Sequence, residues 1–178
     1  LAQNLKSVDR VFVSTDDVII SDVARQYGSE VIDRPTELAK DDTPEWLAWQ
    51  HAISWLKKND EDCEVFLSLP TTSPLRSIAD VEKCLEKLEE GFDFIITVAE
   101  TNRSPWFNMV KRESDGSFNL LLGGGEHIKR RQEAPKVYDM TTVAYVTRPN
   151  FILENNRLWD GQVGAVIIPI ERAIDIDT

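Results

Sequence analysis

The sequence predicts an α/β fold in which helices cover both faces of a parallel sheet. Strand and helix patterns alternate through roughly the first 100 residues, and the strand patterns at 64–69 and 92–98 are apolar. Strands that are buried on both faces are typical of parallel sheets packed between amphipathic helices. The length of 178 residues is that of one ordinary domain, so we treat 1–178 as a single domain.

The expected elements of the first half follow in a regular order. Strands are expected at 10–15, 30–32, 64–69 and 92–98, and helices are expected to begin near residues 18, 44 and 77. Thr43 is expected to cap the second helix, with Pro44 at its first position, and Ser77 to cap the third. Apolar residues recur at helical spacing in each of these segments, which predicts one buried face for each helix.

Three short polar segments follow strands of the expected sheet. They lie at 14–17, 70–74 and 100–102. Right-handed crossovers bring the carboxyl ends of parallel strands to one edge, and open α/β sheets bind their ligands at that edge. We therefore expect these three segments to line a binding site.

The pattern changes after about residue 100. Short strand patterns at 107–112 and 117–122 flank Ser114, Asp115 and Gly116, which together form a hairpin turn signal. Strand patterns return at 142–147 and 163–169. We interpret residues 103–140 as an excursion from the main sheet, a small antiparallel arm.

The composition limits the possible partners. The chain has 20 lysines and arginines against 31 aspartates and glutamates, a net charge of −11. This balance argues against a nucleic-acid binder and means that a polyanion must be bound through a metal or a few local cations. No apolar run has the length of a membrane span, so we expect no membrane insertion. The two cysteines are expected to be reduced thiols of a cytoplasmic protein.

Asp175 and Asp177 are the strongest chemical signal. They alternate with Ile174 and Ile176, so in a strand both carboxylates would point to one face and both isoleucines to the core. Two such carboxylates can hold Mg²⁺ together with water and phosphate oxygens. The alternative interpretation is an edge strand with aspartates on its solvated face.

Other polar residues are weaker candidates. Thr72 and Ser73, followed by Arg76, come after the strand at 64–69 and could bind a phosphate or a sugar, but a rigid turn would have the same composition. Arg130 and Arg131 offer guanidinium groups to an anion, or they form a solvated surface pair. Asp16 and Asp17 could bind a ligand or cap the helix that follows.

Read together, these segments resemble one family. The similar segments, in order, are 13–17, 34–39 (Arg-Pro-Thr-Glu-Leu-Ala), 72–76 (Thr-Ser-Pro-Leu-Arg), 130–132 (Arg-Arg-Gln), Tyr145 and 174–177 (Ile-Asp-Ile-Asp). They resemble the CMP-sialic acid synthetases, also called acylneuraminate cytidylyltransferases, over nearly the whole chain. The resemblance implies a three-layer Rossmann-like nucleotidyltransferase sheet with a small antiparallel dimerisation arm, which the excursion at 103–140 would form.

The resemblance also implies a reaction and a set of site residues. CTP and a 2-keto-3-deoxy sugar acid would give the CMP-sugar and pyrophosphate, with catalysis by positioning and by Mg²⁺. Asp175 and Asp177 match the residues that bind Mg²⁺ and serve catalysis. The residues expected to bind CTP are Arg34, Thr72, Ser73 and Arg76. The residues expected to bind the sugar acid are Arg131, Gln132, Thr141, Tyr145 and Trp159, with Arg131 acting on the neighbouring subunit of a homodimer.

The chain departs from the family pattern at three points. The family's N-terminal phosphate loop does not occur in this sequence, Pro70-Thr71 replace a Gln-Pro pair, and Thr141 replaces an Asn. The two replacements fall on the sugar side, so N-acetylneuraminate, other nonulosonic acids and an octulosonic acid all stay open. Two further functions also stay open: a nucleotide-sugar glycosyltransferase with an Asp-x-Asp metal site, and a non-catalytic CTP-binding protein.

Overall fold

A computed structural model describes residues 1–61, 63–125, 127–128 and 130–176. Its main sheet contains β3 (Phe66–Ser68), β7 (Tyr138–Thr147), β4 (Phe94–Glu100) and β8 (Val163–Ile167), in that spatial order. A separate parallel pair is formed by β1 (Phe12–Thr15) and β2 (Glu30–Asp33).

The main sheet is mixed, so the expectation of a parallel sheet was wrong for this part of the fold. β7 runs antiparallel to both β3 and β4, whereas β4 and β8 are parallel. The reason lies in the connection from β4 to β7. The chain leaves β4 for the arm and returns directly alongside it, so no crossover helix reverses its direction.

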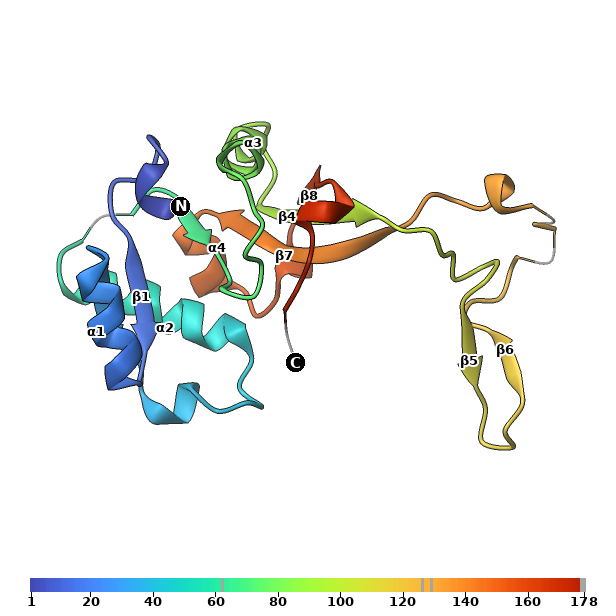
Figure 1. Cartoon of the computed structure of the whole chain (residues 1–178), viewed down its shortest axis with the longest axis horizontal. Helices are drawn as coiled ribbons and strands as arrows, with labels where there is room; N and C mark the ends of the chain where they lie inside the picture. The colour runs from blue at the N-terminus through green and yellow to red at the C-terminus, as the bar shows by residue number, and fades with distance from the viewer. Residues whose placement is uncertain (62, 126, 129, 177–178) are drawn as a thin grey trace.

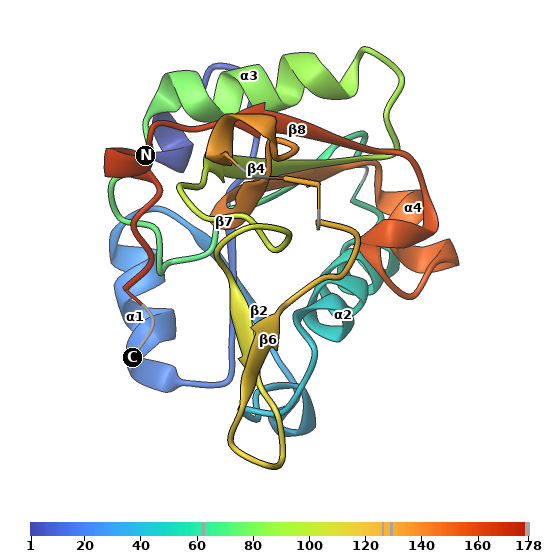
Figure 2. The same ribbon diagram turned by 90° about the vertical axis from the view of Figure 1, so that its right-hand side faces the viewer.

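Helices cover both faces of this sheet, as the three-layer prediction requires (Figures 1 and 2). α3 (Ile78–Leu88) lies on one face, and α2 (Glu45–Lys58) with α4 (Pro149–Glu154) lies on the other. α1 (Val18–Gln26) packs on β1 and β2. The prediction of a three-layer Rossmann-like sheet is confirmed.

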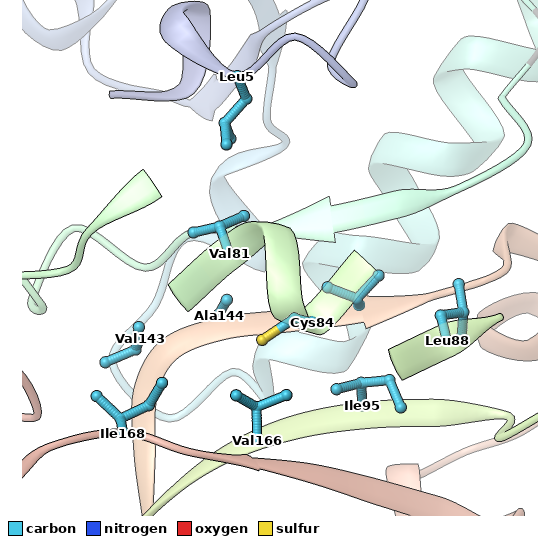
Figure 3. Close-up of a cluster of buried hydrophobic side chains, with 10 residues drawn as sticks. Leu5, Val81, Cys84, Leu88, Ile95, Val143, Ala144, Val166 and Ile168 are labelled. Atoms are coloured by element: carbon cyan, nitrogen blue, oxygen red, sulfur yellow. The ribbon is translucent and has the colours of Figure 1, made fainter. Parts of the chain in front are cut away.

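Two apolar clusters hold the layers together. Under α3, Val81, Cys84 and Leu88 pack against the sheet residues Ile95 and Val143 (Figure 3). Burial raises the pKa of the Cys84 thiol to about 12, so this thiol is a packing group and not a nucleophile.

The second cluster is aromatic and lies under α2. Trp46 and Trp49 each stack on Phe94, with ring centroids 6.0 Å apart in both pairs. Ile53 lies one turn further along the helix and is 1% exposed. The predicted apolar face of this helix is therefore confirmed.

The predicted helix-capping residues are confirmed in part. Ser77 caps α3 in a capping box with Asp80, as its sequence position predicts. Asp17 caps α1, accepting hydrogen bonds from the amides of Ile19 and Ile20 at 2.7 and 2.9 Å. Thr43 does not cap α2: the helix begins at Glu45 after Pro44, and the Thr43 hydroxyl donates to the Glu37 carbonyl at 3.2 Å.

The segment between β4 and β7 contains the antiparallel hairpin predicted within 103–140, but residues 138–140 of that range belong to β7 of the main sheet. β5 (Val110–Arg112) and β6 (Phe118–Leu120) pair antiparallel, and Gly116 adopts a φ of +87° in the turn between them. Figure 1 shows the hairpin projecting away from the layered body. The arm carries exposed apolar side chains: Val110, Phe118, Leu120, Leu121 and Leu122.

Within the described ranges, none of the helices has both the length and the apolar character needed to cross a lipid bilayer.

The aromatic cluster generates a stability prediction. Replacing Ile53 with Ala removes a fully buried side chain, and we expect the free energy of unfolding to fall by about 2–5 kcal/mol. Leu47→Ala in the same helix is the matched control, because Leu47 is 42% exposed, and it should change stability by less than about 0.5 kcal/mol. Urea denaturation followed by circular dichroism measures both. Equal losses in the two variants would contradict the assignment of this helix face.

Candidate functional site

The Thr142 side chain lies where three segments meet at the carboxyl end of β3. Its hydroxyl lies 2.6 Å from the Ser73 hydroxyl and 3.4 Å from that of Thr72, and it donates to the Asp175 carboxylate at 3.1 Å. The loop after β3, strand β7 and the C-terminal segment are thus joined through one hydroxyl. The sequence interpretation placed residues of all three segments in the site but selected Thr141 and Tyr145 from β7 and not Thr142.

Arg76 holds the loop after β3 against β7. Its guanidinium donates to the carbonyls of Pro70 and Thr142. Burial lowers the pKa of this arginine, and its Nε is buried without a hydrogen-bond partner among the residues that the structure describes. A desolvated cation with an unsatisfied donor raises the positive potential where an anionic ligand would sit.

The C-terminal segment is irregular over its described residues 173–176, so the predicted strand at 174–177 is wrong for residues 174–176. The 3-10 turn Ile170–Arg172 redirects the chain after β8, and the segment that follows carries no strand assignment. Ile174 and Ile176 are 46% and 58% exposed, so they do not point into the core. Asp175 is at the site, and Asp177 lies outside the described residues.

Two contacts fix the irregular segment in place. The Ile176 amide donates to the Thr72 carbonyl at 2.9 Å. The Arg172 guanidinium donates to both carboxylate oxygens of Asp80, at 2.8 and 2.9 Å. Asp80 is 1% exposed and also belongs to the α3 capping box. This ion pair therefore ties the segment that carries Asp175 to the start of α3.

A second group of residues lies on the α2 side of the sheet. Arg34 follows β2 and donates to the Ser14 hydroxyl at 3.1 Å and to the Ser14 carbonyl at 2.6 Å. Tyr145 is 6% exposed and packs on Trp49, with ring centroids 5.4 Å apart. Burial raises the pKa of Tyr145, and the charges of Glu45 and Asp175 raise it further.

Glu45 is a site residue that the sequence interpretation missed. Partial burial raises the pKa of its carboxyl group, while a hydrogen bond from Trp49 and the charge of Arg34 act in the opposite direction. Glu45 thus lies within electrostatic reach of both Arg34 and Tyr145. Its position next to Pro44 indicated only an acidic first turn of a helix, so no sequence signal marked it.

Thr141 does not face the site, although it was predicted to bind substrate. Its side chain is 7% exposed and donates to the hydroxyl of Thr97 inside the sheet at 2.8 Å. The next residue, Thr142, reaches the site instead. A shift in the register between β4 and β7 turns Thr141 into the sheet and brings Thr142 to the site.

The structure separates the other predicted substrate residues from this site. Trp159 lies in the 3-10 turn that precedes β8, at the opposite end of the parallel strands, and is 62% exposed. Arg131 and Gln132 lie in a 3-10 turn between β6 and β7 within the arm, and Arg131 donates to the Asn102 side chain at 2.6 Å. A hollow of about 600 Å³, lined in part by Lys57 and Asn150, also lies at that opposite end and contains none of the predicted residues.

The donor set at the site fits part of the coordination of a divalent cation. Mg²⁺ is commonly held by one or two carboxylates together with substrate phosphates. The Asp175 carboxylate is oriented by the Thr142 hydroxyl, so one such oxygen ligand is in place and fits the metal. The described ranges contain no group of three or more His, Cys, Asp or Glu residues that could hold a metal by themselves.

Comparison with known proteins decides the family. Residues 1–148 match the family model described as Cytidylyltransferase. The chain belongs to the cytidylyltransferase family. It is therefore a nucleotidyltransferase, and the resemblance to the CMP-sialic acid synthetases is confirmed by the curated relatives of this cytidylyltransferase.

Among those relatives is CMP-N,N'-diacetyllegionaminic acid synthase of Campylobacter jejuni, which is 31% identical over 180 residues, 99% of this chain and 75% of that protein. Post-translational flagellin modification protein B of Campylobacter coli is 30% identical over 183 residues, again 99% of this chain and 75% of that protein. N-acylneuraminate cytidylyltransferase B of Danio rerio is 27% identical over 96% of this chain but only 39% of its own length.

Solved structures support the fold. CMP:2-keto-3-deoxy-manno-octonic acid synthetase complexed with CTP superposes with a TM-score of 0.62 at 13% identity, over 94% of this chain and 76% of that chain. A 4-diphosphocytidyl-2C-methyl-D-erythritol synthase from Anaerococcus prevotii gives a TM-score of 0.64 at 16% identity, over 99% and 76%.

The Arg172–Asp80 ion pair predicts a pH dependence of stability. Hydrogen bonds from Arg172, aided by those from Ser77 and opposed by burial, lower the pKa of Asp80 from 3.8 to about 2. A depressed carboxyl pKa contributes stability that is fully present above the ordinary value and is lost as the pH falls through the folded value. We expect the free energy of unfolding to fall by about 2 kcal/mol between these pH values, and Asp80→Asn to remove most of that fall.

Urea midpoints measured across this pH range test the prediction. Asp22→Asn is the control, because Asp22 pairs with Arg25 on the surface and is 65% exposed. The control should keep the pH dependence of the wild type. The prediction fails if Asp80→Asn and Asp22→Asn have the same dependence.

Proposed function

We propose that this cytidylyltransferase transfers CMP from CTP to the anomeric hydroxyl of a nonulosonic, sialic-like acid and releases pyrophosphate. The observation that carries the proposal is the meeting of the loop after β3, Thr142 and Asp175 at one sheet edge. The match to CMP-N,N'-diacetyllegionaminic acid synthase, which covers 99% of this chain, supports the choice of a nonulosonic acid.

The reaction is a direct displacement at phosphorus. The anomeric oxygen of the sugar acid forms a bond to the α-phosphorus of CTP, the bond to pyrophosphate breaks, and the hydroxyl proton leaves with solvent or a basic group. No covalent bond to the protein is needed. Mg²⁺, when bound, neutralises charge on the phosphate oxygens. We propose that Asp175 and Asp177 hold this metal.

The remaining site residues bind and orient the two substrates. In the proposal, Arg34 lies at the nucleoside end of CTP, and Thr72, Ser73 and Arg76 lie along its phosphates. Tyr145, beside Glu45, lies at the sugar side. Holding the two reactants in line and placing positive charge at the phosphates are the two sources of acceleration expected of such a site.

A homodimer completes the proposed site. The arm presents exposed apolar residues, including Phe118 at 63% and Val110 at 57% exposure, and apolar patches of this kind favour burial against another chain. Arg131 and Gln132 lie on the arm and would bind the sugar acid at the site of the neighbouring subunit. We place this homodimer in the cytoplasm.

Pyrophosphate release tests the reaction. CTP and Mg²⁺ are offered with N-acetylneuraminate, other nonulosonic acids and an octulosonic acid, with UTP, ATP and GTP as base controls. We expect release with CTP and a nonulosonic acid, and a loss of at least about a hundredfold in Asp175→Asn, because a missing metal ligand leaves phosphate charge uncompensated. Glu90→Gln, which removes an equal charge from the surface pair with Lys87, is the control and should keep full activity.

Other outcomes would contradict the proposal. Turnover of a nucleotide-sugar donor without CTP would favour a glycosyltransferase. Binding of CTP without release of pyrophosphate for every acceptor would favour the non-catalytic alternative.

Mixing two inactive variants tests the shared site. A heterodimer of Arg131→Ala and Asp175→Asn contains one site with both residues intact, so random exchange of subunits should restore about a quarter of the wild-type activity. Size-exclusion chromatography with light scattering checks the dimer. A dimer whose mixed variants stay inactive would show that Arg131 does not act across the interface.

A further inference from the structure

The pairing of β4 with β7 contains an irregularity next to the site. Ile95 pairs with Val146, but Thr97 pairs with Thr141. One residue of β4, Ile96, is therefore opposed by the four residues 142–145 of β7. Extra residues on one strand form a bulge, which bends the strand and redirects its side chains.

The hydroxyl group of Thr97 lies inside this bulge. It accepts hydrogen bonds from the Thr141 hydroxyl at 2.8 Å and from the Ala144 amide at 3.3 Å. The carbonyls of Thr141 and Ala144 lie 3.2 and 3.4 Å from it as acceptors. A threonine hydroxyl has one proton to donate and two lone pairs, so these contacts use its full capacity.

The bulge changes which side chains of β7 reach the site. Val143 and Ala144 are consecutive, yet both are 0% exposed and both pack in the cluster under α3. In a regular strand they would point to opposite faces. Because both turn toward α3, Thr142 remains at the sheet edge beside Ser73 and Asp175, and Tyr145 faces α2.

We infer that Thr97 is a positioning residue of the active site. Its hydroxyl holds the bulge that presents Thr142 to the loop after β3 and to Asp175. The inference rests on the proposed function. Because Thr97 itself is 0% exposed, its hydroxyl is out of reach of a bound substrate, and it acts through the shape of β7.

A buried threonine could also serve stability alone, and the chain offers a matched comparison. Thr147 is the last residue of β7, is also 0% exposed, and donates its hydroxyl to the Asp93 carbonyl at 2.6 Å. It lies outside the bulge, in the regular pairing of Thr147 with Phe94. Thr97→Val and Thr147→Val each remove one buried hydroxyl with little change of shape, and they differ in their relation to the site.

The experiment measures thermal stability and steady-state kinetics for three variants. We expect both valine variants to lower the melting temperature. Well below that temperature, Thr97→Val should lower kcat by about tenfold or more, because the reacting groups are misplaced, whereas Thr147→Val should stay within about twofold of the wild type. Thr97→Ser keeps the hydroxyl and should recover most of kcat.

Hydrogen exchange gives a second measurement that does not depend on turnover. The Ala144 amide should exchange faster in Thr97→Val than in Thr147→Val, because its acceptor is lost. Should Thr97→Val fail to fold, Thr141→Val removes only the hydroxyl–hydroxyl bond and should show both effects in weaker form.

The outcomes separate this inference from the proposed function. A folded Thr97→Val with wild-type kcat and unchanged exchange at Ala144 would overturn the inference while the function stands. A wild-type protein that releases no pyrophosphate with any acceptor would overturn the function, and exchange at Ala144 would then decide whether Thr97 holds the bulge.

Discussion

The place of β7 in the sheet constrains both the core and the site. β7 lies between β3 and β4, so α3 covers one of its faces and α2 with α4 covers the other. A strand in this position must be apolar, yet it must also carry polar groups to the ligand edge. The bulge at 142–145 meets both demands, because it buries Val143 and Ala144 on one face and leaves Thr142 at the edge. Backbone groups in such a bulge lose their partners on the neighbouring strand and, when buried, need others. The Thr97 hydroxyl is the partner of the Ala144 amide.

Beside the carboxylates of Asp175 and Glu45, the site contains neutral hydroxyls and cations that donate to the protein's own carbonyl groups. Arg34 donates to the Ser14 carbonyl, and Arg76 donates to those of Pro70 and Thr142. Guanidinium groups held in this way stay charged and lose little conformational freedom when an anion arrives. An acidic chain with a net charge of −11 can therefore present a local positive potential at one sheet edge. If the positive charges belonged to mobile surface lysines instead, the surrounding carboxylates would cancel their positive potential.

Local signals predicted most of the fold, and long-range pairing explains what they missed. The capping position of Ser77, the apolar face of α2 and the hairpin turn before Ser117 each depend on a few neighbouring residues, so the sequence alone indicated them. The antiparallel course of β7 depends on where the arm returns, which no local pattern reports. The same limit applies to the site. Thr72, Ser73 and Arg76 follow a strand that the sequence indicated, whereas the selection of Thr142 over Thr141 depends on the bulge. The alternation of Ile174 with Asp175 predicted a strand, but the turn at Ile170–Arg172 and the ion pair with Asp80 fix that segment instead.

The arm begins and ends at paired positions of one sheet. Glu100, the last residue of β4, lies opposite Tyr138, the first residue of β7, and the Thr101 amide donates to the Val137 carbonyl at 3.4 Å. Because the two ends are already held together, the entropic cost of a longer or shorter excursion grows only slowly with its length. We therefore expect insertions and deletions in the arm to leave the register of β4 and β7 unchanged. In the proposed homodimer, changes in the arm would alter the residues that one subunit offers to its neighbour and leave the part of the sheet proposed to bind the nucleotide unchanged.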